Sequence, residues 1–287
     1  MNYIQKLEES AKAVNNIACM GLDPKIEVLV ESDKNIRDQI NDYFYKLFRR
    51  MSLSGLVPSA FKPNIGYYQA LDKPRDENFQ GSLALCDILD MLDNFFPSIP
   101  IILDSKRGDI ARSSLNYAIE AFDTWNCDAT TVSPYMGSDS ISPFQIQDKG
   151  LYVLNRTSNP GGKDLQNLIC ENNKPLYLNV SEKIVEWSKK EKGIGAVVGA
   201  TSMKELLDIA KYYSDKEIPM LIPGVGSQGG SATDVINNLN QAKYPLYLAR
   251  INSSSGLTHP WKKDNAPENW LDLCIKQIRD LLEETAV

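Results

Sequence analysis

The stretch Ile101-Ile-Leu-Asp-Ser-Lys-Arg-Gly-Asp109 joins an apolar run to a row of charged residues. Side chains alternate along a strand, so Asp104 and Lys106 are predicted to point to the same side. Gly108 allows a sharp turn, after which Asp109 can direct its carboxylate back to Lys106 or across to another subunit. A charged surface turn has the same composition. The apolar residues before the row instead indicate a buried strand that delivers its polar residues to the mouth of a site.

Further apolar segments of this kind alternate with amphipathic helical patterns along the whole chain. Besides the strand in the opening stretch, the sequence predicts strands at residues 17–23, 57–61, 127–133, 151–154, 194–198, 218–222 and 245–249. No Pro/Ser-rich linker or low-complexity tract interrupts the alternation. This pattern predicts an α/β fold, a single (β/α)8 TIM barrel that forms one domain over residues 1–287. A doubly wound open sheet is the alternative, because the number of strands read from one sequence can differ by one or two from the true number.

Composition describes a globular protein that handles small molecules. Of the 287 residues, 43% are hydrophobic and 24% are charged, which is typical of a globular protein. The formal net charge of −6 disfavours nucleic acid and anionic membranes as partners, although a local basic pocket for a small anion is compatible with it. We therefore expect no nucleic-acid or membrane partner.

Cysteine and histidine usage narrows the chemistry further. The five cysteines are scattered and form no C-x-x-C, which predicts reduced thiols in a cytoplasmic protein. No apolar run reaches the length of a membrane span, and the polar start lacks a signal-peptide core. The single histidine, His259, argues against histidine-based metal sites and Ser-His-Asp triads. Acid–base chemistry is therefore expected from Asp, Glu or Lys.

Polar residues gather where the predicted strands end, which is where TIM barrels place their active sites. These residues are Asp23, Lys62, Asp104, Lys106, Ser158, Gln228 and Arg250. The loops after strands seven and eight of a barrel commonly bind phosphate. Here they contain Gly226 and Gly229, whose backbone can approach a phosphate closely, and Arg250, whose guanidinium can bind two oxygens.

The glycine loop is open to two further interpretations. Residues 224–229 also satisfy the dinucleotide pattern G-x-G-x-x-G, with Arg250 where an arginine can accept a 2′-phosphate. Too little chain follows this loop to complete a six-stranded nucleotide domain. A plain tight turn, with Arg250 in a surface ion pair, is the second interpretation.

The conjunction of these motifs resembles the orotidine 5′-phosphate decarboxylase family, in particular its longer bacterial branch, called type 2. Four segments carry the resemblance: Asp104–Ile110, Pro134–Gly137, Arg156–Gly161 and Pro223–Gly230. The chain departs from the family pattern at Ala111-Arg112-Ser113, where the family usually shows a Gly and soon a Thr.

The resemblance implies a lyase that decarboxylates orotidine 5′-monophosphate (OMP) to uridine 5′-monophosphate (UMP) and CO2, the last step of de novo UMP synthesis. It implies no metal and no other cofactor. Lys106 would donate the proton to C6 of the pyrimidine and Asp104 would face the substrate carboxylate, with Asp109 and Lys62 completing the catalytic group. It further implies a homodimer with shared active sites, in which Asp109 and Ser113 enter the neighbouring subunit's site.

The remaining implied contacts are to the substrate. Gln228 and Arg250 would hold the phosphate, Ser158 the pyrimidine edge, and Asp23 with Lys62 the ribose. Plainer roles compete with some of these: a helix N-cap for Asp23 and an extended surface side chain for Lys62.

The pyrimidine contact and the reaction itself each have competing interpretations. Thr157 and Asn159 offer groups similar to Ser158. A metal-dependent sugar-phosphate decarboxylase and a catalytically idle nucleotide-binding barrel compete with the implied function.

Overall fold

The computed structural model describes residues 1–30, 33–226, 229–261 and 265–287. Its strands are β1 (Ala18–Leu22), β2 (Ala60–Pro63), β3 (Ile102–Arg107), β4 (Ala129–Val132), β5 (Gly150–Arg156), β6 (Ile194–Val198), β7 (Met220–Pro223) and β8 (Ala249–Ser253). Its α-helices are α1 (Tyr3–Val14), α2 (Ile36–Leu53), α3 (Ile65–Gln69), α4 (Gln80–Phe95), α5 (Ala111–Ile119), α6 (Ser138–Ile141), α7 (Lys163–Gln166), α8 (Leu176–Trp187), α9 (Met203–Tyr213), α10 (Ala232–Gln241), α11 (Ser255–Thr258) and α12 (Trp270–Glu284).

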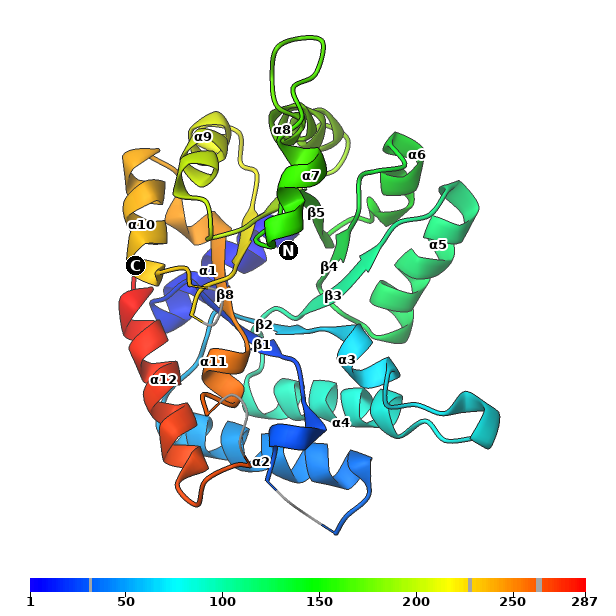
Figure 1. Cartoon of the computed structure of the whole chain (residues 1–287), viewed down its shortest axis with the longest axis vertical. Coiled ribbons are helices and arrows are strands. Elements are labelled where there is room, and N and C mark those ends of the chain that lie inside the picture. Colours follow the sequence, from blue (N-terminus) through cyan, green and yellow to red (C-terminus); the bar gives the residue numbers. More distant parts are fainter. Residues whose placement is uncertain (31–32, 227–228, 262–264) are drawn as a thin grey trace.

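The strands form a parallel barrel with the helices around it (Figure 1). Their order is β2-β1-β8-β7-β6-β5-β4-β3 in an eight-stranded sheet. Isolated parallel bridges join Phe61 to Ile101 and Asn64 to Asp104, so the first and last strands of that order also meet. The fold is thus the predicted (β/α)8 TIM barrel, and the open-sheet alternative is wrong.

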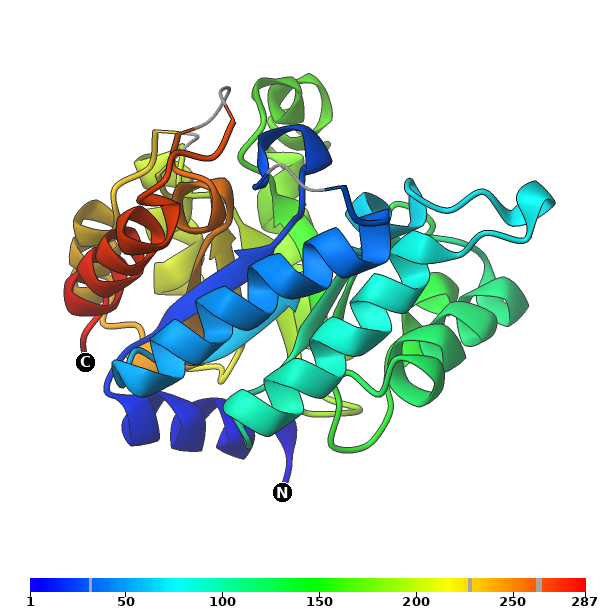
Figure 2. The same cartoon turned by 90° about the horizontal axis from the view of Figure 1, so that it is seen from below.

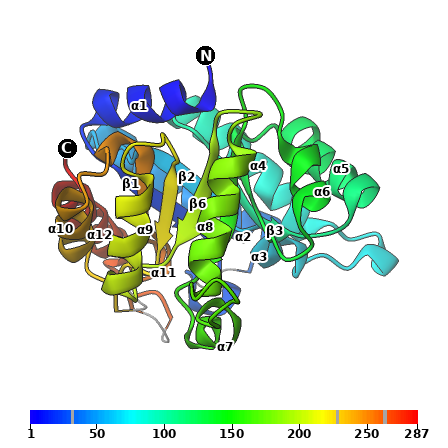
Figure 3. The ribbon, with the colours of Figure 1, turned by 90° about the horizontal axis from the view of Figure 1, so that it is seen from above.

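Helix α1 covers one end of the barrel, and the functional loops lie at the other. Figures 2 and 3 show α1 at one end, whereas α7 and α11 lie at the opposite end in Figure 3. Tyr3 and Leu7 of α1 are fully buried and pack with barrel-interior residues such as Cys19 and Tyr152. The end where the strands begin is therefore filled with packed side chains inside the barrel, and the site is expected at the carboxyl-terminal end.

Long amphipathic helices bury their apolar faces against the outside of the barrel. The predicted helix at about 33–52 is α2, which begins after the N-cap residue Asn35 and packs beside α4 (Figure 2). The predicted helix at 113–124 is α5 followed by one π-helical turn, Glu120–Thr124. Within the described residues, no helix combines the length and apolar character needed to cross a membrane.

The eighth strand begins later than predicted. The sequence predicts a strand at 245–249, but residues Leu246–Leu248 form a 3₁₀ turn and β8 runs from Ala249 to Ser253. Pro245 supplies no N–H to a strand ladder, and the parallel pairing with β1 aligns Ala18 with Ile251. Arg250 is therefore the second residue of the strand and lies near its beginning.

Candidate active site

A cavity of about 670 Å³ opens at the carboxyl-terminal ends of the strands. It has the size of a typical small-molecule site. Residues from all eight strands, or from the loops directly after them, line it. The structure thus places a ligand-sized cavity at the end of the barrel where this fold carries its chemistry.

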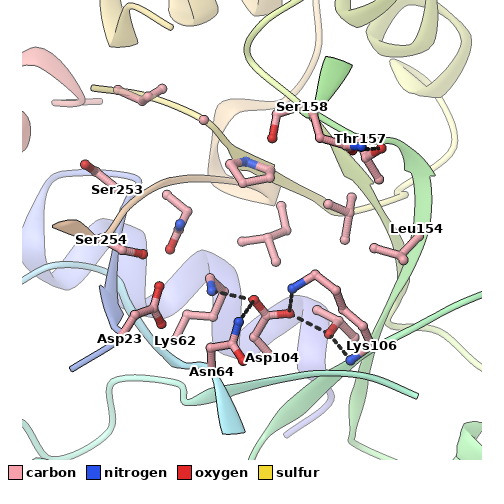
Figure 4. A pocket seen from close by; sticks show the side chains of 18 of the residues that line it. Asp23, Lys62, Asn64, Asp104, Lys106, Leu154, Thr157, Ser158, Ser253 and Ser254 are labelled. Carbon is pink, nitrogen blue, oxygen red and sulfur yellow. Dashed lines mark hydrogen bonds and ion pairs between the residues drawn. The ribbon is translucent and has the colours of Figure 1, made fainter. Parts of the chain in front are cut away.

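Asp104 is the centre of a charged group at the β2–β3 side of this cavity (Figure 4). Its Oδ2 accepts from Lys62 Nζ at 2.8 Å and from Asn64 Nδ2 at 3.5 Å. Its Oδ1 accepts from Lys106 Nζ at 2.6 Å and from Thr131 Oγ1 at 2.8 Å. The predicted proximity of Asp104 and Lys106 is confirmed, and Lys62 belongs to the same group.

Burial and charge act in opposite directions on this group. Burial by itself raises the pKa of Asp104, but the charges of Lys62 and Lys106 outweigh it and hold that pKa below its usual range. Burial likewise lowers the pKa of Lys62, but the carboxylates of Asp104 and Asp23 outweigh it and leave that pKa raised. A carboxyl group whose pKa is lowered in the folded state stabilises the fold at pH values above its ordinary pKa. A lysine whose pKa is raised in the folded state stabilises the fold at pH values below its ordinary pKa. The full stabilisation from this ion pair is therefore present between about pH 4 and about pH 10, and it is lost only as the pH passes beyond these limits through the shifted pKa values.

Lys106 has an unusual backbone conformation. Its φ is +45°, in the left-handed region that residues other than glycine rarely adopt. The β3–β4 register shifts between Leu103 and Arg107, and the backbone N–H of Lys106 donates to Thr131 Oγ1 at 2.9 Å. Such strain costs of order 1–3 kcal/mol and is concentrated at functional sites. The regular alternation that predicted the contact with Asp104 is thus modified at Lys106 itself.

Asp23 and Lys62 do not have the plainer roles. Asp23 lines the cavity, and the helix cap position before the turn Ile26–Val28 is Lys25 instead. Its Oδ1 is buried and lacks a hydrogen-bond partner among the described residues. Lys62 is 4% exposed, and its ammonium is paired with Asp104, so it is not a surface side chain.

The loop after β5 presents Ser158 to the cavity. Thr157, Ser158 and Asn159 all line it, but Thr157 Oγ1 donates to Asn159 Oδ1 at 2.7 Å. Gln166 of α7 fixes the loop by accepting from the Thr157 N–H at 2.9 Å. Thr201 Oγ1 donates to the Ser158 carbonyl at 2.9 Å, while the Ser158 hydroxyl makes no hydrogen bond to any described residue. Ser158 therefore has the hydroxyl that is available to a ligand.

Asp109 and Ser113 lie away from the cavity of their own chain. Neither residue lines it, and Asp109 Oδ1 accepts from the backbone N–H of Ile110 at 2.8 Å. The Asp109 carbonyl accepts from Ser114 Oγ at 2.6 Å, which anchors the start of α5. The carboxylate is therefore not directed back to Lys106, and the predicted contact across a subunit boundary stays a prediction.

The predicted phosphate contact of Arg250 is wrong. Its side chain is fully buried at the closed end of the barrel, where its guanidinium donates to the Leu7 carbonyl at 2.6 Å and to Ser10 Oγ at 2.7 Å. Further bonds go to the carbonyls of Ser59, Tyr247 and Ala249. The misplacement follows from the late start of β8, because a residue at the beginning of a strand faces the end opposite to the cavity.

The glycine loop after β7 forms a closed turn. Gly226 and Gly229 have φ values of +84° and +91°, which explains the requirement for glycine. The Gly226 N–H donates to the Gly230 carbonyl at 3.0 Å, and the Gly229 N–H donates to the Gly226 carbonyl at 2.9 Å. The loop presents Gly224 and Val225 to the cavity, whereas the two predicted N–H groups are used within the turn. Gln228, the second predicted phosphate contact, lies outside the described residues.

Sequence reasoning missed two residues of the charged group, Asn64 and Thr131. Asn64 follows Lys62 by two positions, so strand alternation already places both on one side. Thr131 is a buried hydroxyl within a strand, and such a group needs a partner. Within the described residues, no three His, Cys, Asp or Glu side chains are grouped so that they could hold a metal ion.

Comparisons with known proteins show which family the chain belongs to. A model of the orotidine 5′-phosphate decarboxylase / HUMPS family matches residues 52–247. An orotidine 5′-phosphate decarboxylase of Herpetosiphon aurantiacus is 39% identical over 235 residues, which cover 82% of this chain and 83% of that protein. The enzyme of that name from Bordetella avium is 36% identical over 98% of this chain and 97% of its own length.

A solved structure of an enzyme with this activity has a similar fold. The structure of Leishmania donovani OMP decarboxylase superposes with a TM-score of 0.74 at 27% identity, and 99% of each chain is covered. The family match covers more than half of the chain, and the Bordetella avium protein aligns over nearly its whole length. The chain therefore belongs to the orotidine 5′-phosphate decarboxylase family and is a carboxy-lyase.

Proposed function

We propose that this protein converts OMP to UMP and CO2 in UMP synthesis, with Lys106 as the proton donor and without a metal or other cofactor. The bond between C6 and the carboxylate breaks, CO2 leaves, and the electron pair stays on C6. The Lys106 ammonium then gives its proton to C6 and recovers one from water. The observation that carries the proposal is the Lys62–Asp104–Lys106 group at the cavity.

The size of each electrostatic effect shows whether charge repulsion or stabilisation of the carbanion contributes more to the rate. Two carboxylates about 4 Å apart at an effective dielectric constant near 20 repel each other by about 4 kcal/mol, which corresponds to roughly three decades of rate. Enzymes of many classes accelerate their reactions by far more than this. Stabilisation of the developing carbanion by the fixed Lys106 ammonium must therefore supply much of the remainder.

The proposed contacts to the ribose and the pyrimidine use side chains that line the cavity. Asp23 and Lys62 are proposed to bind the ribose, and Ser158 the pyrimidine edge. The orphaned Asp23 Oδ1 supports the first assignment, because a ribose hydroxyl can donate to it. The unpartnered Ser158 hydroxyl supports the second.

Incubation of the purified protein with OMP tests the reaction directly. We expect the ultraviolet absorbance change of OMP consumption, together with CO2 and UMP in equal amounts. The same rate is expected in excess chelator, because the proposed reaction uses no metal ion. Loss of turnover on chelation would instead favour the metal-dependent relatives, and binding of UMP without any CO2 release would favour an idle nucleotide-binding barrel.

We further propose a homodimer with shared active sites. Ile110 and the α5 side chains Leu115 and Ile119 are exposed apolar groups directly after Asp109. The exposed Tyr135 and Met136 precede α6, which lies beside α5 on the outside of the barrel (Figure 1). An apolar surface of this kind is typical of a protein–protein interface. It would carry Asp109 and Ser113 toward the cavity of a second copy.

Mixing two inactive variants tests the sharing of sites. Lys106→Ala and Asp109→Asn are each expected to be nearly inactive alone. Random re-association after mild dissociation should restore about one quarter of wild-type activity, because each mixed dimer has one site with both residues intact. Each variant re-associated alone is the control. No recovery in a mixture whose mixed dimers are verified by mass would show that Asp109 does not act across the interface.

A cytoplasmic location remains a prediction. All five cysteines are unpaired, as expected of a protein in a reducing compartment.

A further inference from the structure

Arg250 does not line the cavity, so another group must bind the substrate's phosphate. The net charge of the described lining comes from five side chains: Asp23, Lys25, Lys62, Asp104 and Lys106. Lys62 and Lys106 are both ion-paired with Asp104. In the described part of the chain, Lys25 is the lining cation that has neither an ion pair nor a side-chain hydrogen bond.

Lys25 also lies on the correct side of the cavity. Barrel enzymes bind phosphate near the loops after strands seven and eight. Strand β1, which ends just before Lys25, pairs directly with β8. A Cβ on Gly21 of β1 would lie 1.8 Å from Ser254 Oγ, so the loop after β8 packs closely over β1. Figure 4 accordingly shows Asp23, Ser253 and Ser254 together on one side.

A second contact ties the two loops together beyond the strands. Trp261, which follows α11, donates from its Nε1 to the Val28 carbonyl at 2.8 Å. Val28 belongs to the short turn that begins directly after Lys25. The segment carrying Lys25 is thus held against the segment after β8, so the exposed lysine starts from backbone that lies near the β8 loop.

The neighbouring histidine does not supply this charge. His259 is 2% exposed, and burial first and the charge of Lys25 second lower its pKa, so the ring is neutral near pH 7. Thr258 Oγ1 and His259 Nδ1 share a hydrogen bond at 2.9 Å, and Thr258 Oγ1 also lies 3.2 Å from the Ser254 carbonyl. A neutral ring supplies no positive charge to a phosphate.

We propose that Lys25 binds the 5′-phosphate of the substrate and supplies the positive charge of that subsite. This inference rests on the proposed OMP decarboxylation. The phosphate dianion meets the ammonium of Lys25 near Ser254 and Ser255, while Lys62 and Lys106 remain committed to Asp104. Without Lys25, the charges of the described lining would balance, and no net positive charge there would favour an anionic tail over a neutral one.

The test compares substrates with and without the phosphate. Lys25→Met, which keeps most of the aliphatic stem, is expected to lower kcat/KM for OMP by roughly 10- to 100-fold, the usual effect of losing a charged hydrogen bond. The same variant should process orotidine, which lacks the phosphate, as fast as wild type does. Lys25→Arg should retain most of the activity toward OMP. Lys46→Ala, an exposed lysine of α2 away from the cavity, is the matched control and should change neither value.

Two results would overturn the proposal. An equal loss with both substrates would assign Lys25 a structural role, and unchanged kinetics with OMP would place the phosphate elsewhere. Calorimetry with UMP and uridine repeats the comparison without catalysis, with weaker binding of Lys25→Met expected for UMP alone. That measurement decides the role of Lys25 even if wild-type protein does not decarboxylate OMP, an outcome that would refute the proposed function separately.

Discussion

Lys106→Ala is expected to lower kcat for OMP by at least about 10⁴-fold, because it removes both a proton donor and a preorganised charge. In enzymes generally, each of these effects alone contributes roughly two to four decades. The Lys106 side chain is 47% exposed, and Asp104 keeps its bond to Lys62. The variant should therefore fold normally and still bind UMP.

Lys106→Arg separates the proton donor from the charge. Arginine stays protonated and cannot transfer its proton under ordinary conditions, although it preserves the positive charge. We expect this variant to be nearly as inactive as Lys106→Ala. Initial rates from the ultraviolet change, with circular dichroism and UMP calorimetry on the same samples, provide the measurement. Substantial turnover by either variant would remove Lys106 from the role of proton donor.

Arg250→Met is expected to lower the melting temperature by about 5–8 °C, which corresponds to a loss of roughly 3–5 kcal/mol of unfolding free energy. The guanidinium is the shared donor to several backbone carbonyls and to Ser10 Oγ at the closed end of the barrel. Methionine fills much of the space but leaves these buried acceptors without that donor. The relief of desolvating a charge offsets part of this cost.

Kinetics of the folded Arg250→Met variant should match wild type, with KM for OMP unchanged. Scanning calorimetry for stability and initial rates below the melting transition provide the two measurements. Conversely, an unchanged melting temperature with a raised KM for OMP, but not for orotidine, would restore the predicted phosphate contact. The variant thereby distinguishes a residue that closes the barrel from a residue that binds substrate.

Local sequence patterns predicted the charged residues of the cavity well, because such patterns depend only on residues that are close together in the chain. Apolar segments alternating with amphipathic helices require a parallel sheet, and the carboxyl ends of parallel strands meet at one end of a barrel. Asp23, Lys62, Asp104 and Lys106 follow this rule, and all four line the cavity. The same rule failed for Arg250, because it depends on knowing where a strand begins and ends.

By itself, the sequence determined the alternation of strands and helices and the polar character of the strand ends, since both depend on short segments. The closure of the sheet into a barrel was decided by the bridges that join the β2 and β3 segments. Only the tertiary structure decided which end of β8 carries Arg250, that Asn64 and Thr131 complete the shell of Asp104, and that Lys25 lies beside the loop after β8. These outcomes depend on the register between strands and on α1 covering one end. Both are set by contacts between segments far apart in the chain, which no single segment contains.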